Sequence, residues 1–253
     1  MCIAVFMWQA HPLYPFLLLL NRDEYHNRPT KPVGWWENGE ILGGKDEVAG
    51  GTWLACSKQG RVAFLTNVLE LHTLPEAKSR GDLAIRFLES NKSPKAFAEE
   101  ELVKEANQYN GFNLIAADLV SKSMVYVSNR PKGEPVSIQE VLPGIHAERL
   151  ELNFKNQVCQ YGEGEIPVKE MVEKLMRDTV KADESKLPKI CSPDWEFVLS
   201  SIFVEVDTPL GKYGTRSTAA LTVKASGEAS FYEIYLEGDM WKQHTLNYHI
   251  QKL

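Results

Sequence analysis

Residues 16–24 read FLLLLNRDE, in which five apolar residues are followed at once by four with hydrogen-bonding side chains. A short apolar run of this kind is typical of a buried strand, so we expect a strand over residues 16–20. The polar quartet at residues 21–24 then lies where the strand ends, and such a group at a strand exit can form a functional site. It can equally form a solvated turn with surface ion pairs, which contribute little stability.

Further strands are indicated on both sides of this stretch. The apolar residues 2–8 predict a strand, whereas residues 21–51, with Pro29, Pro32 and several glycines, predict a long loop. Other strands are predicted as a hairpin over residues 52–57 and 61–68, then at 112–118 and 124–128, and near the end at 217–225, 229–236 and 246–250.

Helix signals separate these groups of strands. Ser79 and Asp82 are close to a capping box, and Ser93-Pro94 and Ser192-Pro193 mark two further helix starts. Residues 168–176 carry apolar side chains at helical spacing and predict an amphipathic helix. Strands and helices in this order predict an α+β fold in which helices cover stacked antiparallel sheets, and the even composition predicts one domain over residues 1–253.

The composition restricts the class of protein. The chain has 253 residues with 28 basic and 34 acidic side chains, and its net charge of −6 argues against binding of nucleic acids or anionic membranes. The four cysteines are scattered without metal-binding spacing, which favours a reducing compartment. The leucines at residues 17–20 are too few to span a bilayer, so we expect a cytoplasmic protein without a transmembrane segment.

Cys2 directly follows the initiator methionine. Cysteine is small enough for Met1 to be trimmed, which leaves Cys2 with a nucleophilic thiol and a free α-amine able to take its proton. Arg22 could then lower the pKa of the thiol, and Asp23 could orient the ammonium group. From its position alone, a small buried residue that begins a strand is the simpler interpretation of Cys2.

Several longer motifs run through nearly the whole chain. After Met-Cys-Ile come NRDEYHNRP at 21–29, GGTWL at 50–54, LTN at 65–67, YNGFNL at 109–114, SNR at 128–130 and YGTRS at 213–217. Together these motifs resemble the NRDE family, also known as the transport and Golgi organisation protein 2 homologues, with plant-like members nearest. That family in turn resembles the N-terminal nucleophile hydrolases, which are four-layer α-β-β-α sandwiches.

The resemblance implies roles for five residues. Cys2 matches the nucleophile, and Arg22 and Asp23 match an arginine and an aspartate beside it. Asn67 matches an oxyanion-hole amide, and Arg216 matches a late active-site arginine. The last two also have structural interpretations, since Asn67 could cap a turn and Arg216 could pair with an acid.

The chain departs from the family after Pro143-Gly144-Ile145-His146. Relatives continue with a Ser-Asn or Thr-Asn pair and the start of a helix, whereas here Ala147-Glu148-Arg149-Leu150 follows, and about a dozen family residues are missing. The lost asparagine matches a further polar residue of the hydrolase site. This deletion near residues 146–150 therefore argues against catalysis.

Three functions are compatible with these observations. The resemblance implies a soluble carrier or chaperone for Golgi organisation, protein secretion and intracellular haem or lipid homeostasis, located in the cytoplasm with association to the Golgi or mitochondria. The alternative is an N-terminal cysteine amidohydrolase or acyl-transfer enzyme that uses Cys2 as its nucleophile. The third is a partner-binding or partly folded form.

The expected ligands differ between these functions. No cofactor is required, while transient haem binding or an acyl or amide compound is the implied small-molecule ligand. We expect no metal site, because the histidines lack metal-ligand spacing, and no phosphate-binding loop. Trp35-Trp36 could stack on a flat ligand, although packing over the core is the commoner fate of tryptophan. The substrate and the oligomeric state stay open.

Overall fold

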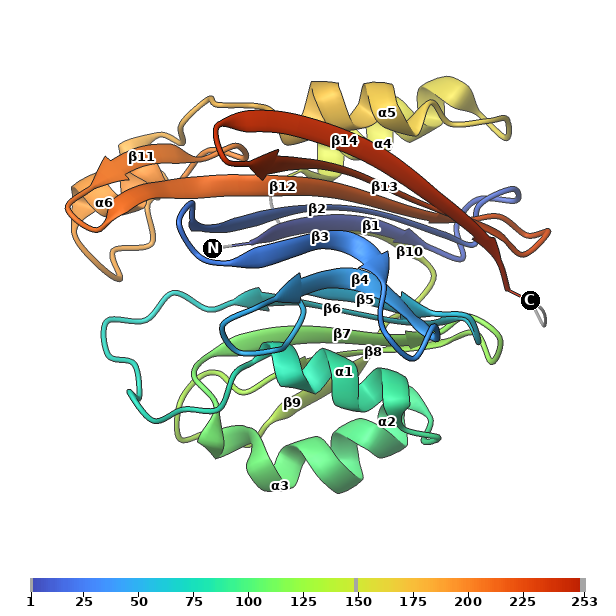
Figure 1. Cartoon of the computed structure of the whole chain (residues 1–253), viewed down its shortest axis with the longest axis horizontal. Helices are drawn as coiled ribbons and strands as arrows, with labels where there is room; N and C mark the ends of the chain where they lie inside the picture. Colours follow the sequence, from blue (N-terminus) through green and yellow to red (C-terminus); the bar gives the residue numbers. More distant parts are fainter. Residues whose placement is uncertain (1, 148–149, 251–253) are drawn as a thin grey trace. The chain divides into compact units, whose positions relative to one another are not determined.

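The computed structural model describes residues 2–147 and 150–250. The chain divides into two compact units, the first formed by Met1–Arg28 with Pro143–Tyr248 and the second by Pro29–Leu142 with His249–Leu253. Each unit combines one sheet with helices (Figure 1). Met1 and part of the predicted deletion, at residues 148 and 149, lie outside the described residues.

The described part of the first unit contains a seven-stranded sheet with β2 and β12 at its centre. Its order is β10-β1-β2-β12-β13-β14, with β11 paired to β12, and β2 and β12 pair antiparallel from Tyr25 with Tyr213 to Phe16 with Val223. The strands are β1 (Ile3–Trp8), β2 (Phe16–Tyr25), β10 (Gly144–Ala147), β11 (Glu205–Thr208), β12 (Gly211–Val223), β13 (Glu228–Glu237) and β14 (Met240–His249).

Helices α4 (Glu151–Tyr161) and α5 (Val168–Met171) lie along one face of this sheet (Figure 1). The π-helical turn η3 (Val172–Met176) continues α5, and η4 (Glu184–Lys186) and α6 (Pro193–Val198) follow. Leu17 and Leu19 of β2 share one buried cluster with Phe154, Met171 and Met176 of the helices. The amphipathic helix predicted over residues 168–176 is therefore confirmed, and its apolar stripe packs on the leucine-rich strand.

The second unit contains, among its described residues, a seven-stranded sheet in which every strand neighbours the next along the chain. Helix α1 (Gly81–Glu89) packs on it through Leu83, Phe87 and Leu88, in one cluster with residues of β6 and β7. The strands are β3 (Thr30–Trp35), β4 (Ile41–Asp46), β5 (Leu54–Ser57), β6 (Arg61–Asn67), β7 (Phe112–Asp118), β8 (Ser123–Ser128) and β9 (Ser137–Glu140). The other helical segments are α2 (Pro94–Phe97), η1 (Ala98–Leu102), α3 (Val103–Glu105) and η2 (Ala106–Gln108).

The α+β class with two antiparallel sheets is confirmed. The two units supply the two sheets and the two sets of helices that the expected architecture contains. The predicted hairpin of residues 52–68 is present as β5 and β6, which pair antiparallel. The helix start at Ser93-Pro94 is also confirmed, because the Ser93 hydroxyl accepts a hydrogen bond from the Ala96 amide at 3.2 Å.

The long loop predicted over residues 21–51 is wrong. Strand β2 continues to Tyr25, and β3 and β4 occupy most of the remaining stretch. The glycines that suggested a loop have a packing reason, since a Cβ at Gly43 would come 2.8 Å from the Leu54 carbonyl on the neighbouring strand. Glycine at this position permits close strand pairing instead of ending the strand.

The capping box predicted at Ser79 is also wrong. Helix α1 begins at Gly81 with Arg80 as its N-cap residue, and Ser79 contributes its backbone carbonyl, which accepts from the Asp82 amide at 3.1 Å. Gly81 is required here by close approach, because a Cβ on it would come 2.8 Å from the backbone nitrogen of Thr52.

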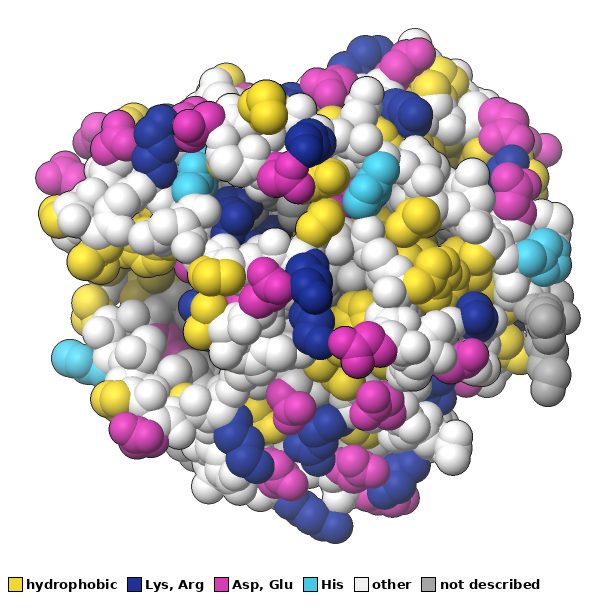
Figure 2. All heavy atoms as spheres, viewed as in Figure 1, with side chains coloured by type: hydrophobic (Ala, Val, Ile, Leu, Met, Phe, Trp, Pro, Cys, Tyr) yellow, Lys and Arg dark blue, Asp and Glu magenta, His cyan; other side chains and the backbone are white. Residues whose placement is uncertain are grey.

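Charges of both signs lie among one another on the face drawn in Figure 2, where Lys and Arg side chains neighbour Asp and Glu. A mixed surface with a net charge of −6 offers no broad basic field on this face for a polyanion. A search of residues 2–147 and 150–250 finds no helix with the length and hydropathy that crossing a membrane requires.

Candidate functional site

The first unit places Cys2, Arg22 and Asp23 together at the start of β1 and the middle of β2. Ile3, which follows Cys2, pairs with Asn21, and Arg22 and Asp23 come next along β2. Burial raises the pKa of the Cys2 thiol and the charge of Asp23 raises it further, while a backbone hydrogen bond from Asp23 and the positive charge of Arg22 act in the opposite direction. The thiol is therefore held mainly protonated in this chain, with a cation beside it.

Asp23 is a buried carboxyl with a defined partner. The Thr215 hydroxyl of β12 donates to Asp23 Oδ1 at 2.7 Å, and the same hydroxyl oxygen accepts from the Val204 amide at 3.0 Å. Burial raises the pKa of Asp23 to about 6, against the hydrogen bond from Thr215. A carboxyl with this pKa can change its protonation state close to neutral pH, which is a property of groups that take part in proton transfer.

Arg216 lies at an irregularity of β12. Thr215 pairs with Asp23 and Ser217 pairs with Arg22, so Arg216 is one extra residue on the longer strand. Its Nη1 donates to the Tyr25 carbonyl at 3.2 Å and to the Arg28 carbonyl. The bulge thus turns the guanidinium toward the end of β2, and bulges of this kind are frequent beside active sites.

Asn21, the first residue of the polar quartet, has a structural role. Its Nδ2 donates to the carbonyls of Met176 at 2.8 Å and Ile202 at 2.9 Å, and its Oδ1 accepts from the Thr218 hydroxyl at 2.6 Å. This fully buried amide thereby joins β2 to η3 and to the segment that follows α6. These bonds explain why the strand continues through polar residues that sequence reasoning assigned to a loop.

Two further residues belong to this cluster, and the sequence analysis did not identify them. Thr215 holds Asp23, and Tyr213 lies with its ring 5.1 Å from Tyr25 and 5.5 Å from Trp195. Burial, followed by the charges of Asp23 and Cys2, raises the pKa of the Tyr213 hydroxyl. Both residues stand in the motif YGTRS, in which only Arg216 had been singled out.

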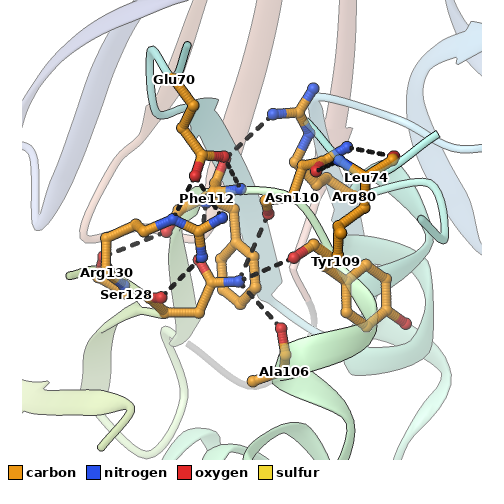
Figure 3. A network of polar contacts seen from close by, with 11 residues as sticks. Glu70, Leu74, Arg80, Ala106, Tyr109, Asn110, Phe112, Ser128 and Arg130 are labelled. Carbon is orange, nitrogen blue, oxygen red and sulfur yellow. Dashed lines mark hydrogen bonds and ion pairs between the residues drawn. The ribbon is translucent and has the colours of Figure 1, made fainter. Parts of the chain in front are cut away.

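Asn67 belongs to the second unit, where it is the last residue of β6 and pairs with Phe112 of β7. The segment that follows it is held by a network of polar contacts (Figure 3). The amide of Val68 donates to the Gly111 carbonyl at 3.0 Å, and Arg80 Nη1 donates to the same carbonyl at 3.0 Å. Both ends of the segment after Asn67 are therefore fixed to Gly111.

The centre of the network is the pair formed by Glu70 and Arg130. Glu70 Oε1 lies 2.6 Å from Arg130 Nε and 2.5 Å from its Nη2, and Glu70 Oε2 accepts from the Gly111 amide at 2.6 Å (Figure 3). Both side chains are mostly buried. Charge-assisted bonds of this kind are stronger and more directional than neutral ones.

Two asparagines complete the network. Asn129 accepts from the Phe112 amide at 3.0 Å and donates to the Ala106 carbonyl at 2.9 Å, and Asn110 exchanges two hydrogen bonds with the backbone of Leu74. The motifs YNGFNL and SNR thus supply the residues that hold the segment after Asn67 (Figure 3). The sequence alone does not reveal that these two motifs hold the segment after Asn67, because the network joins residues that are far apart in the chain.

Candidate ligands for a metal are scattered. Within residues 2–147 and 150–250, no three side chains of His, Cys, Asp and Glu come together in a way that could hold a metal ion. The arrangement at Cys2 instead combines a thiol, a carboxyl and a guanidinium. Such a set can activate a nucleophile and hold an ammonium group without a metal.

Among solved structures, a variant of conjugated bile acid hydrolase from Clostridium perfringens is similar, with 11% identity, 98% of this chain and 97% of that chain covered, and a TM-score of 0.45. The Caenorhabditis elegans ortholog of N-acylethanolamine-hydrolyzing acid amidase is similar with 8% identity, coverage of 87% and 92%, and a TM-score of 0.42. Likenesses this distant assign no activity.

The sequence comparisons are much closer. The chain is 32% identical to a Transport and Golgi organization 2 homolog of Mus musculus and 30% identical to that of Homo sapiens, with 99% of this chain and 100% of each relative covered. The mouse alignment extends over 278 positions, more than the 253 residues here, so the relative has residues that this chain lacks. The family model described as Transport and Golgi organisation 2 matches residues 1–238. The chain therefore belongs to the Transport and Golgi organisation 2 family.

Proposed function

We propose that the chain is an N-terminal cysteine hydrolase that cleaves an amide or a thioester, with Cys2 as the nucleophile. The observation that supports this is the contact between Cys2, Arg22 and Asp23, in which Asp23 is buried, bonded to Thr215 and has a pKa of about 6. A buried carboxyl beside a thiol and an arginine has little structural benefit on its own, because burial of its charge costs stability.

Removal of Met1 is the activating step in this proposal. While Met1 is attached, residue 2 has no free amine and its thiol has a raised pKa. Once Met1 is removed, the α-amine of Cys2 takes the thiol proton, with an ordinary pKa of about 7.7–8.0 for such an amine. Asp23 can then hold the resulting ammonium group, and Arg22 favours the thiolate.

The reaction then follows two steps. The thiolate attacks the acyl carbon, the leaving amine or thiol takes the proton from the ammonium, and a thioester to Cys2 remains. Water attacks this thioester, its proton passes to the amine of Cys2, and the acid and the free thiol are released.

The test is turnover of amide and thioester substrates by the Met1-free protein. We expect activity that is lost in Cys2→Ala and retained in Cys159→Ser, which removes the exposed thiol of α4 as a matched control. Equal turnover by the Cys2→Ala variant would contradict the proposal. Turnover absent from the wild type across acyl chain lengths and leaving groups would contradict it as well.

The second candidate is a carrier of haem or lipid that serves Golgi organisation and secretion in the cytoplasm, with association to the Golgi or mitochondria. It is favoured by the names of the relatives that this chain matches over its length, which refer to transport. Titration with haemin separates the two, since a carrier gives a saturable change of the Soret band whether or not Cys2 is replaced by Ala. If the protein shows no cooperative unfolding transition, this result would instead indicate the partly folded form.

A further inference from the structure

The hairpin β3–β4 of the second unit carries a pocket that the Cys2 chemistry does not use. Its cavity has a volume of about 320 Å³, and two tryptophans and two lysines are among the nine residues of the strands and their turn that line it. We propose that this pocket binds a small flat aromatic compound with one negative charge, such as an aromatic carboxylate. The proposal is independent of the hydrolase proposal.

The aromatic part of the pocket is preformed. Trp36 packs against the core cluster of the second unit, and its Nε1 donates to the Gly43 carbonyl at 3.1 Å, which fixes the orientation of the indole. Trp35, also in the lining, keeps about a third of its surface exposed at 37%. An indole ring fixed beside an open space, as that of Trp36 is, is suited to stacking on a flat ring.

The charged side chains that line the pocket favour the binding of an anion. Lys31 and Lys45 contribute two ammonium groups, whereas Glu37 is the acid among the lining residues. Lys45 Nζ lies 5.0 Å from the centre of the Trp36 ring, and Lys31 pairs with Glu47 at 3.8 Å, with both of these side chains well exposed. Lys31 can therefore turn toward a carboxylate at little cost, because exposed ion pairs are weak, and Lys45 already lies beside the Trp36 ring.

The pocket is open because of the backbone of β3, which pairs irregularly with β4. The pairing of β3 with β4 is irregular between Lys31 and Gly34, where Pro32 interrupts the ladder. Gly34 leaves the site open, since a Cβ built there would meet only the Pro32 carbonyl, at 3.9 Å. A larger side chain at this position can therefore enter the pocket without backbone strain.

The cavity volume limits the occupant to a small molecule. A volume of about 320 Å³ is at the lower end of the range for small-molecule sites, about 300–1,000 Å³. One or two fused rings with a carboxylate fit this space. At the ligand efficiency typical of drug-sized compounds, a compound of about 13 non-hydrogen atoms is expected to bind with a Kd of about 1 mM.

The probe is 1-naphthoate, titrated into ¹⁵N-labelled full-length protein while the indole N–H signals are followed by NMR. We expect saturable shifts of the Trp35 and Trp36 indoles at a Kd near 1 mM. Gly34→Leu, which fills the pocket, should abolish the shifts, and Lys31→Gln with Lys45→Gln should weaken binding about tenfold. A cooperative unfolding transition of each variant shows that it has folded.

Two controls complete the test. Lys58→Gln removes one positive charge at a lysine 5.1 Å from the Trp35 ring but outside the lining, and it should bind as the wild type does. The neutral 1-naphthalenemethanol should bind about tenfold more weakly than 1-naphthoate. Unchanged binding in Gly34→Leu, or equal binding of the neutral compound, would overturn the proposal, as would shifts spread over the other indoles without saturation.

Discussion

Asp23 makes the stability of the folded chain depend on pH in an unusual direction. Its pKa is raised by burial to about 6, whereas an aspartate in an unfolded chain titrates near about 3.9. Between these values the folded state binds more protons than the unfolded state. Stability therefore falls as the pH rises through this window, and the penalty is fully present above pH 6.

The variant Asp23→Asn removes this penalty while it keeps an acceptor for the Thr215 hydroxyl. We expect the wild type to lose about 2 kcal/mol relative to the variant between pH 4 and pH 7, from a shift of about two pKa units. Urea unfolding at several pH values measures the difference. A constant difference between the two proteins over this range would show that Asp23 titrates normally.

Asn21 is predicted to matter for stability and not for chemistry. Asn21→Ala leaves two buried carbonyls and the Thr218 hydroxyl without their bonds to the amide. At about 1–3 kcal/mol for an unsatisfied buried group, the variant should lose about 3 kcal/mol or more of unfolding free energy. Denaturant melts give this value, and a loss below about 1 kcal/mol would mean that water replaces the amide.

At the scale of elements, the segment after β6 is held from outside by residues of two other motifs. The pair of Glu70 and Arg130 joins this segment to the end of β8, and Asn110 and Asn129 add bonds to backbone groups (Figure 3). Since the segment follows Asn67 directly, the network defines the direction in which the chain leaves the strand.

Glu70→Gln should therefore cost about 3 kcal/mol of unfolding free energy, because one partner of a mostly buried ion pair loses its charge. Amide hydrogen exchange of residues 68–80 should accelerate in the same variant. The control is Lys78→Gln, which breaks an exposed pair with Glu105 and should cost much less than Glu70→Gln, because exposed ion pairs are weak. Equal costs for the two variants would contradict the role of the network.

Sequence reasoning succeeded where a pattern is local. The apolar run of β2, the stripe of residues 168–176 and the cap at Ser93 follow from neighbours in the chain, and each is present. It failed for β3 and β4, whose glycines serve close strand pairing. It also missed Thr215, which bonds to Asp23, and Tyr213, which the charges of Asp23 and Cys2 affect, because both stand on β12, far along the chain from those two residues.

At the scale of the whole molecule, composition predicts what the protein does not bind. With 34 acidic and 28 basic side chains, and with both signs mixed on the face of Figure 2, the chain lacks the excess positive charge that polyanions require. We expect no retention on heparin at physiological salt and no binding to anionic vesicles. Tight retention that weakens steeply with salt would contradict this prediction.

The central claim is that Cys2 becomes an N-terminal nucleophile, and the most direct measurement is the intact mass of protein from a eukaryotic host before and after iodoacetamide at neutral pH. The account predicts that Met1 is absent and that Cys2 is labelled before the exposed Cys159. The variant Cys2→Ala should lose this fast labelling. Retention of Met1, or labelling that begins at Cys159, would contradict the account.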